Sequence, residues 1–194
     1  MAHILPHWNW EERIGEITPV HVFTSGDEAE LFLNGKSLGR KKKGQYEYRL
    51  RWDSVKYEPG ELKVIAYKKG KIWAEDIVKT TGKPTSLAAI SDRNEIRADG
   101  KDVAFITVRI TDTNGLTVPR TNNRIKYSIE GPGEIVATDN GDPTNLEAFP
   151  SHEREAFNGL GLVIVRSKTG EEGTIKVKMQ STELKETQVI LHSK

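Results

Sequence analysis

Polar and apolar residues alternate along most of this chain with a period of two, which is typical of strands that cover a core with one face. The clearest run lies between residues 46 and 52. Its alternate positions are Tyr46, Tyr48, Leu50 and Trp52. We expect this face to lie in a hydrophobic core. No helical periodicity of note accompanies such runs, so the sequence predicts an all-β protein.

The stretch Ala29–Gly39 predicts a β-hairpin. Leu31 and Leu33 alternate with polar neighbours, and Asn34-Gly35 supplies two residues that tolerate the positive φ of a type I′ turn. A return strand is expected to start at Lys36, followed by a basic turn over residues 40–44. A lone hairpin is not stable in water, so further strands must pair with this one.

Further alternating segments divide the chain into two halves. Residues 3–18 lack periodicity and are expected to form an ordered loop or junction. Gly82-Lys83-Pro84 interrupts the alternation, which starts afresh afterwards. We therefore expect two tandem immunoglobulin-like β-sandwich domains, at 3–82 and 85–194. The other expected strands cover residues 20–25, 28–33, 62–67, 72–80, 87–90, 103–111, 124–130, 134–138, 162–166, 174–180 and 187–191.

Composition narrows the classes of partner. Hydrophobic residues make up 36% and charged residues 29% of the chain, and the net charge of +1 gives no basic field for a nucleic-acid partner. With no cysteine, neither a disulfide nor a thiolate metal site can form. No apolar run reaches the roughly 18 residues of a membrane span. Met1-Ala2 leads directly into His3 without a signal core, so we expect a piece of a longer protein in which Met1 is a cloning residue.

Three segments of the first half resemble one known family. The opening His3–Trp10, the segment Thr18–Ser25 and the hairpin Ala29–Gly39 are similar to the region that follows the catalytic barrel in β-galactosidases of glycoside hydrolase family 2. In the second half, Ala156–Ser167 resembles the terminal domain of those enzymes. Ala98–Gly115 resembles the early strands of bacterial immunoglobulin-like domains of the invasin and intimin type.

This resemblance implies the C-terminal, non-catalytic part of a glycosidase of carbohydrate metabolism, in a periplasmic or secreted parent. The parent would hydrolyse terminal β-galactosides with retention, using two glutamates on its barrel. No segment here matches that barrel, so no catalytic residue and no cofactor are assigned. The expected partners are the parent's barrel and a β-galactoside or another plant or host glycan. Nearly all of the 28 Asp and Glu residues fall in turns or on polar strand faces, which is typical of solvated surface.

The cluster His7-Trp8-Asn9-Trp10 is the candidate site, and two interpretations remain open for it. Tryptophan faces bind the C–H face of a sugar while His and Asn bond its hydroxyls, which favours a carbohydrate subsite. Alternatively, Trp8 and Trp10 seal the joint with the missing barrel. The two roles are compatible if the joint borders the active-site mouth.

Other features predict less chemistry. The five histidines lack metal-ligand spacing, and residues 139–142 resemble a calcium loop without its later ligands, so no metal site is expected. Trp52 and Trp73 are expected within strands, and the basic run at 40–43 has no aromatic residue to stack a base.

The competing function is a carbohydrate-binding or adhesin-like spacer module of a surface protein.

Overall fold

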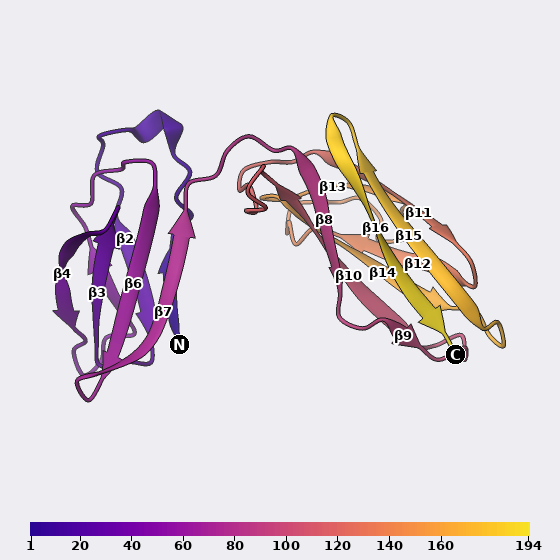
Figure 1. Cartoon of the computed structure of the whole chain (residues 1–194), viewed down its shortest axis with the longest axis horizontal. Coiled ribbons are helices and arrows are strands. Elements are labelled where there is room, and N and C mark those ends of the chain that lie inside the picture. The colour runs from indigo at the N-terminus through magenta and orange to yellow at the C-terminus, as the bar shows by residue number, and fades with distance from the viewer. The chain divides into compact units, whose positions relative to one another are not determined.

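The computed structural model describes residues 1–194 as two compact units, Met1–Thr81 and Gly82–Lys194, which we call the first and second domains. Each domain has a hydrophobic core of its own. Both consist of strands, and the one helical segment is a 3-10 turn at Glu11–Arg13 (Figure 1). No helix reaches the length and hydrophobicity that a membrane span requires. The predicted all-β fold class with two β-sandwich domains is confirmed.

The first domain is a sandwich of two antiparallel sheets. One has the strand order β1-β2-β5 and the other β4-β3-β6-β7. Their inward faces enclose Val22, Leu31 and Val64, which are fully buried. The strands are β1 (Ala2–Leu5), β2 (Val20–Thr24), β3 (Glu28–Leu33), β4 (Lys36–Lys42), β5 (Arg49–Trp52), β6 (Glu61–Lys68) and β7 (Lys71–Lys79).

The second domain also has two layers, and its first strand takes part in both. β8 pairs antiparallel with β10 and meets β16 in a parallel bridge between Ser86 and Lys185, while β9 continues beside β16. The resulting strand order is β12-β14-β10-β8-β16-β15-β11-β13. The strands are β8 (Ser86–Ser91), β9 (Glu95–Ile96), β10 (Val103–Thr111), β11 (Arg124–Glu130), β12 (Gly133–Asp139), β13 (Glu153–Glu155), β14 (Leu160–Ser167), β15 (Gly173–Ser181) and β16 (Leu184–Ser193).

The hairpin between β3 and β4 forms at the expected turn. Asn34 and Gly35 have φ values of 50° and 79°, as a type I′ turn requires. The return strand is longer than expected, because β4 continues to Lys42 through residues that we predicted as a basic turn. Its pairing with β3 extends to Glu28↔Lys42, so backbone hydrogen bonding outweighs the polar sequence.

The expectation that residues 46–52 present one continuous buried face is wrong for its first half. Tyr46 and Tyr48 are 90% and 68% exposed, whereas Leu50 and Trp52 are buried. A turn at Gly44 occupies this region, since the Glu47 carboxylate accepts a hydrogen bond from the Gly44 N–H. Pairing with β2 therefore begins only at Arg49.

The opening segment is also more regular than its sequence suggests. β1 pairs with β2 from Ala2↔Thr24 to Leu5↔His21, within residues that we expected to form a loop. Ile4 of this strand is 2% exposed. A strand of four residues contains too few alternations to be recognised by periodicity, and the same reason applies to β9 and β13.

Candidate functional site

Trp8, the second member of the candidate cluster, lies in the core of the first domain. Its side chain is fully buried and its ring centroid is 4.9 Å from that of Tyr57. The indole Nε1 donates a hydrogen bond of 2.8 Å to the Glu58 carbonyl, and the Thr80 hydroxyl donates one of 2.6 Å to the Trp8 carbonyl. The indole face is therefore not accessible to a sugar, and the residue fastens the segment after β1 to the end of β7.

His7 and Trp10 form an aromatic stack near the surface. Their rings are 4.4 Å apart at an interplanar angle of 17°. The Trp10 Nε1 donates to the His7 carbonyl over 2.8 Å, and the Asn9 backbone N–H donates to His7 Nδ1 over 3.3 Å. Because Nδ1 accepts this bond, a neutral His7 carries its proton on Nε2. Both side chains are partly exposed.

Asn9 joins this stack to the end of β7. Its side-chain amide lies 2.7 Å from the Thr81 hydroxyl. The fold thus brings His7, Asn9 and Trp10 together and turns Trp8 inward. Sugar contact or an interdomain role for the three outer residues stays a prediction.

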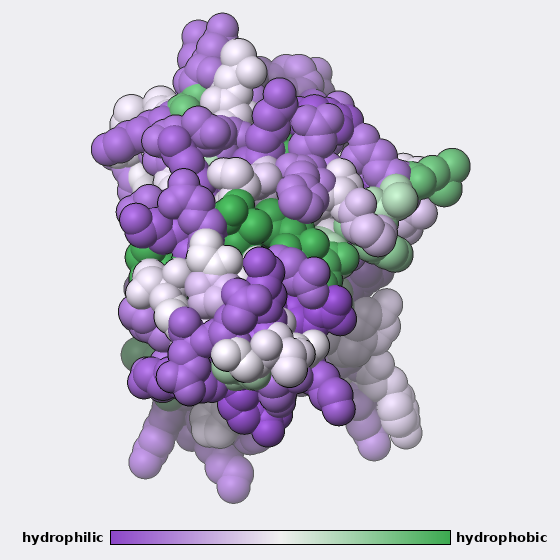
Figure 2. Space-filling view, turned by 90° about the vertical axis from the view of Figure 1, so that its right-hand side faces the viewer, coloured by the Kyte–Doolittle hydropathy of each residue, from purple (hydrophilic) through white to green (hydrophobic).

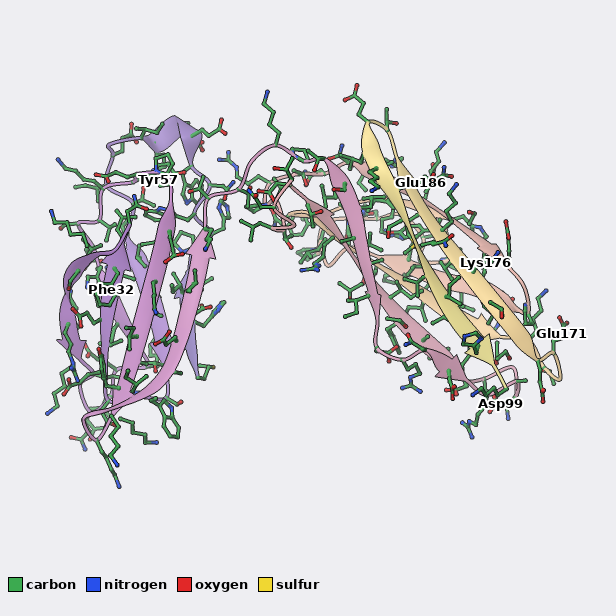
Figure 3. The ribbon with its side chains drawn as sticks, viewed as in Figure 1. Phe32, Tyr57, Asp99, Glu171, Lys176 and Glu186 are labelled. Carbon is green, nitrogen blue, oxygen red and sulfur yellow. The ribbon has the colours of Figure 1, made fainter.

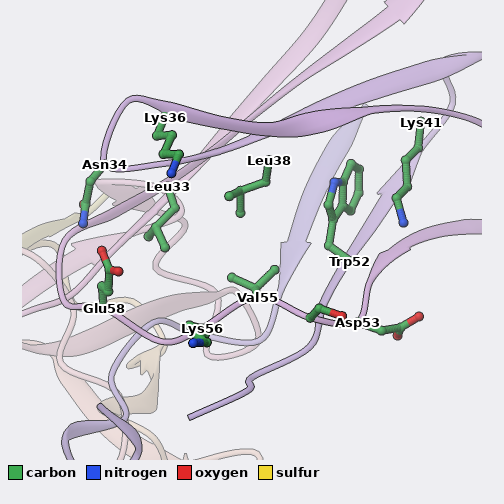
Figure 4. Close-up of a pocket in the computed structure, with 11 residues that line it drawn as sticks. Leu33, Asn34, Lys36, Leu38, Lys41, Trp52, Asp53, Val55, Lys56 and Glu58 are labelled. Carbon is green, nitrogen blue, oxygen red and sulfur yellow. The ribbon is translucent and has the colours of Figure 1, made fainter. Parts of the chain in front are cut away.

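A pocket with a volume of about 580 Å³ opens in the first domain between β4 and the chain that follows β5 (Figure 4). Sequence reasoning missed it, because residues that line it lie about 20 positions apart and come together only through packing of the two sheets. Trp52 is 4% exposed there, and its Nε1 donates to the Gly39 carbonyl over 3.3 Å. The apolar lining residues are Leu33, Leu38, Trp52 and Val55, and the polar ones are Asn34, Lys36, Lys41, Asp53, Ser54, Lys56 and Glu58.

Two polar side chains at this pocket are held by their neighbours. Asp53 is 56% exposed and accepts hydrogen bonds of 3.1 and 2.8 Å from the Arg51 guanidinium. Lys41 lies over the Trp52 ring at 5.4 Å.

Hydrogen bonds lower the pKa values of several carboxyl groups elsewhere in the chain. Hydrogen bonds from Lys178 and Gln180 lower the pKa of Glu186, and the backbone N–H groups of Asp102 and Lys101 lower that of Asp99. Figure 3 shows Asp99 and Glu186 near opposite ends of the second domain. Such groups stabilise turns and ion pairs, and their separation precludes a shared acid/base site.

The turn that resembles a calcium loop uses its polar side chains internally. Asn140 Oδ1 accepts a hydrogen bond from the Asp142 N–H over 3.0 Å, and Asp142 Oδ1 accepts one from the Thr144 N–H over 2.9 Å. No group of three His, Cys, Asp or Glu residues within 1–194 has a metal-binding arrangement. These hydrogen bonds account for the residue types of the turn.

Comparison with known proteins places this fold in a family. Residues 87–190 match the glycoside hydrolase family 2 C-terminal domain 5, and residues 15–74 match a domain of unknown function, DUF4982. The beta-galactosidase BoGH2A of Bacteroides ovatus is 39% identical over 96% of this chain. A beta-glucuronidase of Formosa agariphila is 28% identical over 99% of it.

A solved structure shares the arrangement of strands. The crystal structure of a beta-glycosidase from Bacteroides vulgatus covers 98% of this chain at 33% identity with a TM-score of 0.92. The chain spans only 22% of the Bacteroides ovatus relative, 19% of the Formosa agariphila relative and 24% of the solved Bacteroides vulgatus chain. Since the match at residues 87–190 extends over more than half of its length, the chain belongs to the glycoside hydrolase family 2 C-terminal domain family.

Proposed function

We propose that this chain is the non-catalytic C-terminal part of an enzyme that hydrolyses terminal β-galactosides. The observation that carries the proposal is the 39% identity, over 96% of the chain, to a relative named beta-galactosidase. Two relatives named putative beta-glucuronidase and beta-glucuronidase are 34% and 28% identical, over 74% and 99% of the chain, so galactosides are favoured over glucuronides by the higher identity and coverage of the galactosidase match. Hydrolysis would proceed by double displacement on two carboxylates outside this chain.

In this proposal, residues 3–82 follow the catalytic barrel and residues 85–194 close the enzyme. The segment His7–Trp10 supports the wall of the active site or the joint with the barrel. The stack of His7 on Trp10 and the contact of Asn9 with Thr81 favour such a role, because they fix three hydrogen-bonding or aromatic side chains at the domain surface. Trp8 would contribute by holding this segment in place from inside the core.

Activity assays with two preparations test the proposal. The purified chain is expected to release no product from a nitrophenyl β-galactoside, whereas the enzyme encoded by the complete native gene hydrolyses it. Nitrophenyl β-glucuronide serves as the competing substrate. Faster turnover of the glucuronide by the complete enzyme would contradict the galactoside assignment, and a gene without a catalytic barrel would contradict the enzyme proposal.

Within the complete enzyme, Trp10→Ala tests the role of the outer cluster. We expect KM for the galactoside to rise by about tenfold, equivalent to about 1.4 kcal/mol of binding, while the melting temperature stays within about 2 °C. The matched control is Tyr46→Ala, whose ring is 90% exposed in the turn before β5. Unchanged KM in the Trp10 variant would remove sugar contact from the proposal and leave the joint.

A second candidate function is a carbohydrate-binding or adhesin-like module, and the exposed Trp73 favours it. The indole is held in place because its Nε1 donates to the Ser25 hydroxyl over 2.9 Å, and Lys68 lies 4.7 Å from the ring centroid. The similarity of Ala98–Gly115 to invasin-type domains belongs to this candidate. Saturable quenching of tryptophan fluorescence by galactose, lost in Trp73→Ala, would support it; no quenching would count against it.

A further inference from the structure

The loop from Asn140 to His152, between β12 and β13, carries two large hydrophobic side chains in solvent. Leu146 is 96% exposed and Phe149 is 60% exposed. Hydrophobic side chains also reach the surface elsewhere on the second domain (Figure 2). Isolated exposures of this kind are common in proteins. The 140–152 loop differs because the structure also fixes its conformation.

A buried arginine anchors the 140–152 loop from below. Arg154 is 2% exposed. Its Nη2 donates to the Ala148 carbonyl over 2.7 Å and to the Glu147 carbonyl over 3.2 Å, and its Nε donates to the Thr138 hydroxyl over 3.2 Å. Burying a guanidinium is costly unless its donors are satisfied. Here two loop carbonyls satisfy Nη2 and Thr138 satisfies Nε, and the Glu147 carboxylate lies 3.9 Å from Nη1, so the charge and the loop conformation stabilise each other.

Side chains within the loop add further constraints. The Asn145 side chain accepts a hydrogen bond from the Glu147 N–H over 2.8 Å. The Phe149 carbonyl accepts one from the backbone N–H of Thr138 on β12 over 2.8 Å. Arg124 on β11 donates to the Glu147 carboxylate over 2.6 Å. These contacts fix the loop while Leu146 is exposed. Binding through Leu146 would therefore cost little additional backbone entropy. Preorganisation of this kind lowers the entropy cost of ordering a loop on binding.

The charge around the loop and the length of the related enzymes indicate what the loop would bind. Acidic residues outnumber basic ones around it, and a complementary surface would present lysine or arginine around an apolar cavity. Relatives that match this chain over 96% to 99% of its length are about four to five times longer, since the chain covers only 22% and 19% of them. Most of the surface available to the loop in such an enzyme thus lies outside this chain. Arg124 pairs with Glu147, Glu153 and Glu155, and Arg154 with Glu147, but these two cations do not neutralise all of the nearby carboxylates. The nearby acidic residues are Asp139, Asp142, Glu147, Glu153 and Glu155.

We propose that the 140–152 loop docks the second domain onto the part of the parent enzyme outside this chain, with Leu146 seated in an apolar cavity rimmed by basic side chains. This inference rests on the proposed function, because it requires a larger parent. It goes further by assigning the contact to one loop and by stating the chemistry of the opposing surface.

Thiol labelling tests the docking. The chain has no cysteine, so Leu146→Cys introduces one reactive thiol at the tip of the loop. We expect a maleimide to label this position at least tenfold more slowly in the complete enzyme than in the isolated chain, measured peptide by peptide with mass spectrometry. Glu171→Cys, in the exposed turn between β14 and β15, is the matched control and should react equally in both. In 1 M NaCl the protection should weaken, because salt screens the charged rim.

Two results would overturn the inference while the proposed function stands. One is equal labelling of Leu146→Cys in the complete enzyme and the isolated chain. The other is protection in the isolated chain that increases with its concentration, which would assign the contact to a second copy. A native gene that encodes no further enzyme domain would instead overturn both the inference and the proposed function.

Discussion

At the scale of single residues, buried polar side chains hold the loops of the second domain in place. Arg154 does so for the 140–152 loop, and Asp112 does so for the turn after β10. The Asp112 carboxylate accepts hydrogen bonds of 2.9 Å from the N–H groups of Gly82, Asn114 and Leu116. Each of these side chains forms hydrogen bonds with several backbone groups that would otherwise lack a partner. Its removal therefore leaves more than one backbone group without a hydrogen bond.

Arg154→Met tests the anchor of the loop. We expect this substitution to lower the free energy of unfolding of the second domain by about 3 kcal/mol, because the buried carbonyl and hydroxyl groups that bond the guanidinium lose their partner. Urea unfolding followed by circular dichroism measures this change. The control is Arg166→Met, whose ion pair with Glu134 is solvent-exposed and should contribute less than about 1 kcal/mol. Equal effects of the two substitutions would contradict the anchoring role.

Asp112 should make the stability of the second domain depend on acid pH. Burial raises the pKa of this carboxyl, but the hydrogen bonds from Gly82, Leu116 and Asn114 outweigh it, so the pKa lies below its ordinary value. A lowered folded-state pKa contributes stability above the unfolded pKa of about 3.9, and this contribution is lost as the pH falls through the folded value.

We therefore expect Asp112→Asn to destabilise the second domain by about 2 kcal/mol at pH 7, the scale of a hydrogen bond to a charged group. The difference from the native chain should shrink as the pH falls below about 4. Urea unfolding at pH 7, 5 and 3 measures it. A difference that stays constant over this range would show that the charge of Asp112 does not contribute.

At the scale of elements, three strands have the bounds that their sequence predicts, Glu28–Leu33, Val103–Thr111 and Arg124–Glu130, whereas the basic run at 40–44 is strand as far as Lys42. Asn34-Gly35 specifies its turn through two residues that accept positive φ. The side chain of Asn34 then contacts a second turn, since its Oδ1 accepts a hydrogen bond from the Glu61 N–H over 2.9 Å. A Cβ at Gly60 would lie 1.9 Å from that oxygen. The sequence predicts the turn at Asn34-Gly35, but only packing shows why the turn at Gly60 needs glycine.

Gly35→Ala measures how much the hairpin depends on its turn. Gly35 has a φ of 79°, and beyond its chain neighbours no atom lies within 4 Å of the place that an alanine Cβ would take, so the cost arises from backbone conformation alone. We expect a loss of about 1 kcal/mol from the first domain. The control Lys36→Ala, next in the chain and exposed, should change stability by less than about 0.5 kcal/mol. A loss of several kcal/mol would indicate strain beyond the turn.

At the scale of the whole molecule, the two domains have separate hydrophobic cores, and their spectroscopic probes are separate as well. All four tryptophans lie in the first domain. Their fluorescence therefore reports on the first domain, while circular dichroism reports on the strands of both. The largest buried residues of the two cores illustrate the separation, with Trp8 and Tyr57 in the first domain and Ile106 and Met179 in the second.

This separation predicts a selective effect on unfolding. Arg154→Met should lower the urea midpoint of the second-domain transition seen by circular dichroism and leave the midpoint of tryptophan fluorescence within about 0.2 M, given denaturant slopes of about 1–3 kcal/mol/M for small domains. Leu31→Ala, in the core of the first domain, should have the opposite selectivity. If both probes shift together for both variants, the domains unfold as one cooperative unit.

The sequence by itself determined the fold class, the Asn34-Gly35 turn and the family resemblance, because strand alternation and turn chemistry act between near neighbours. Tertiary structure decided which aromatic residues are buried. Trp8 entered the core through its contacts with Tyr57 and Glu58, whereas Tyr46 and Tyr48 were left in solvent. It also decided that Arg154 is buried beneath an exposed Leu146. Whether a side chain is buried depends on contacts with residues that are distant along the chain, or with loop carbonyls that packing brings close to a buried guanidinium. The local pattern of polar and apolar residues does not encode these contacts.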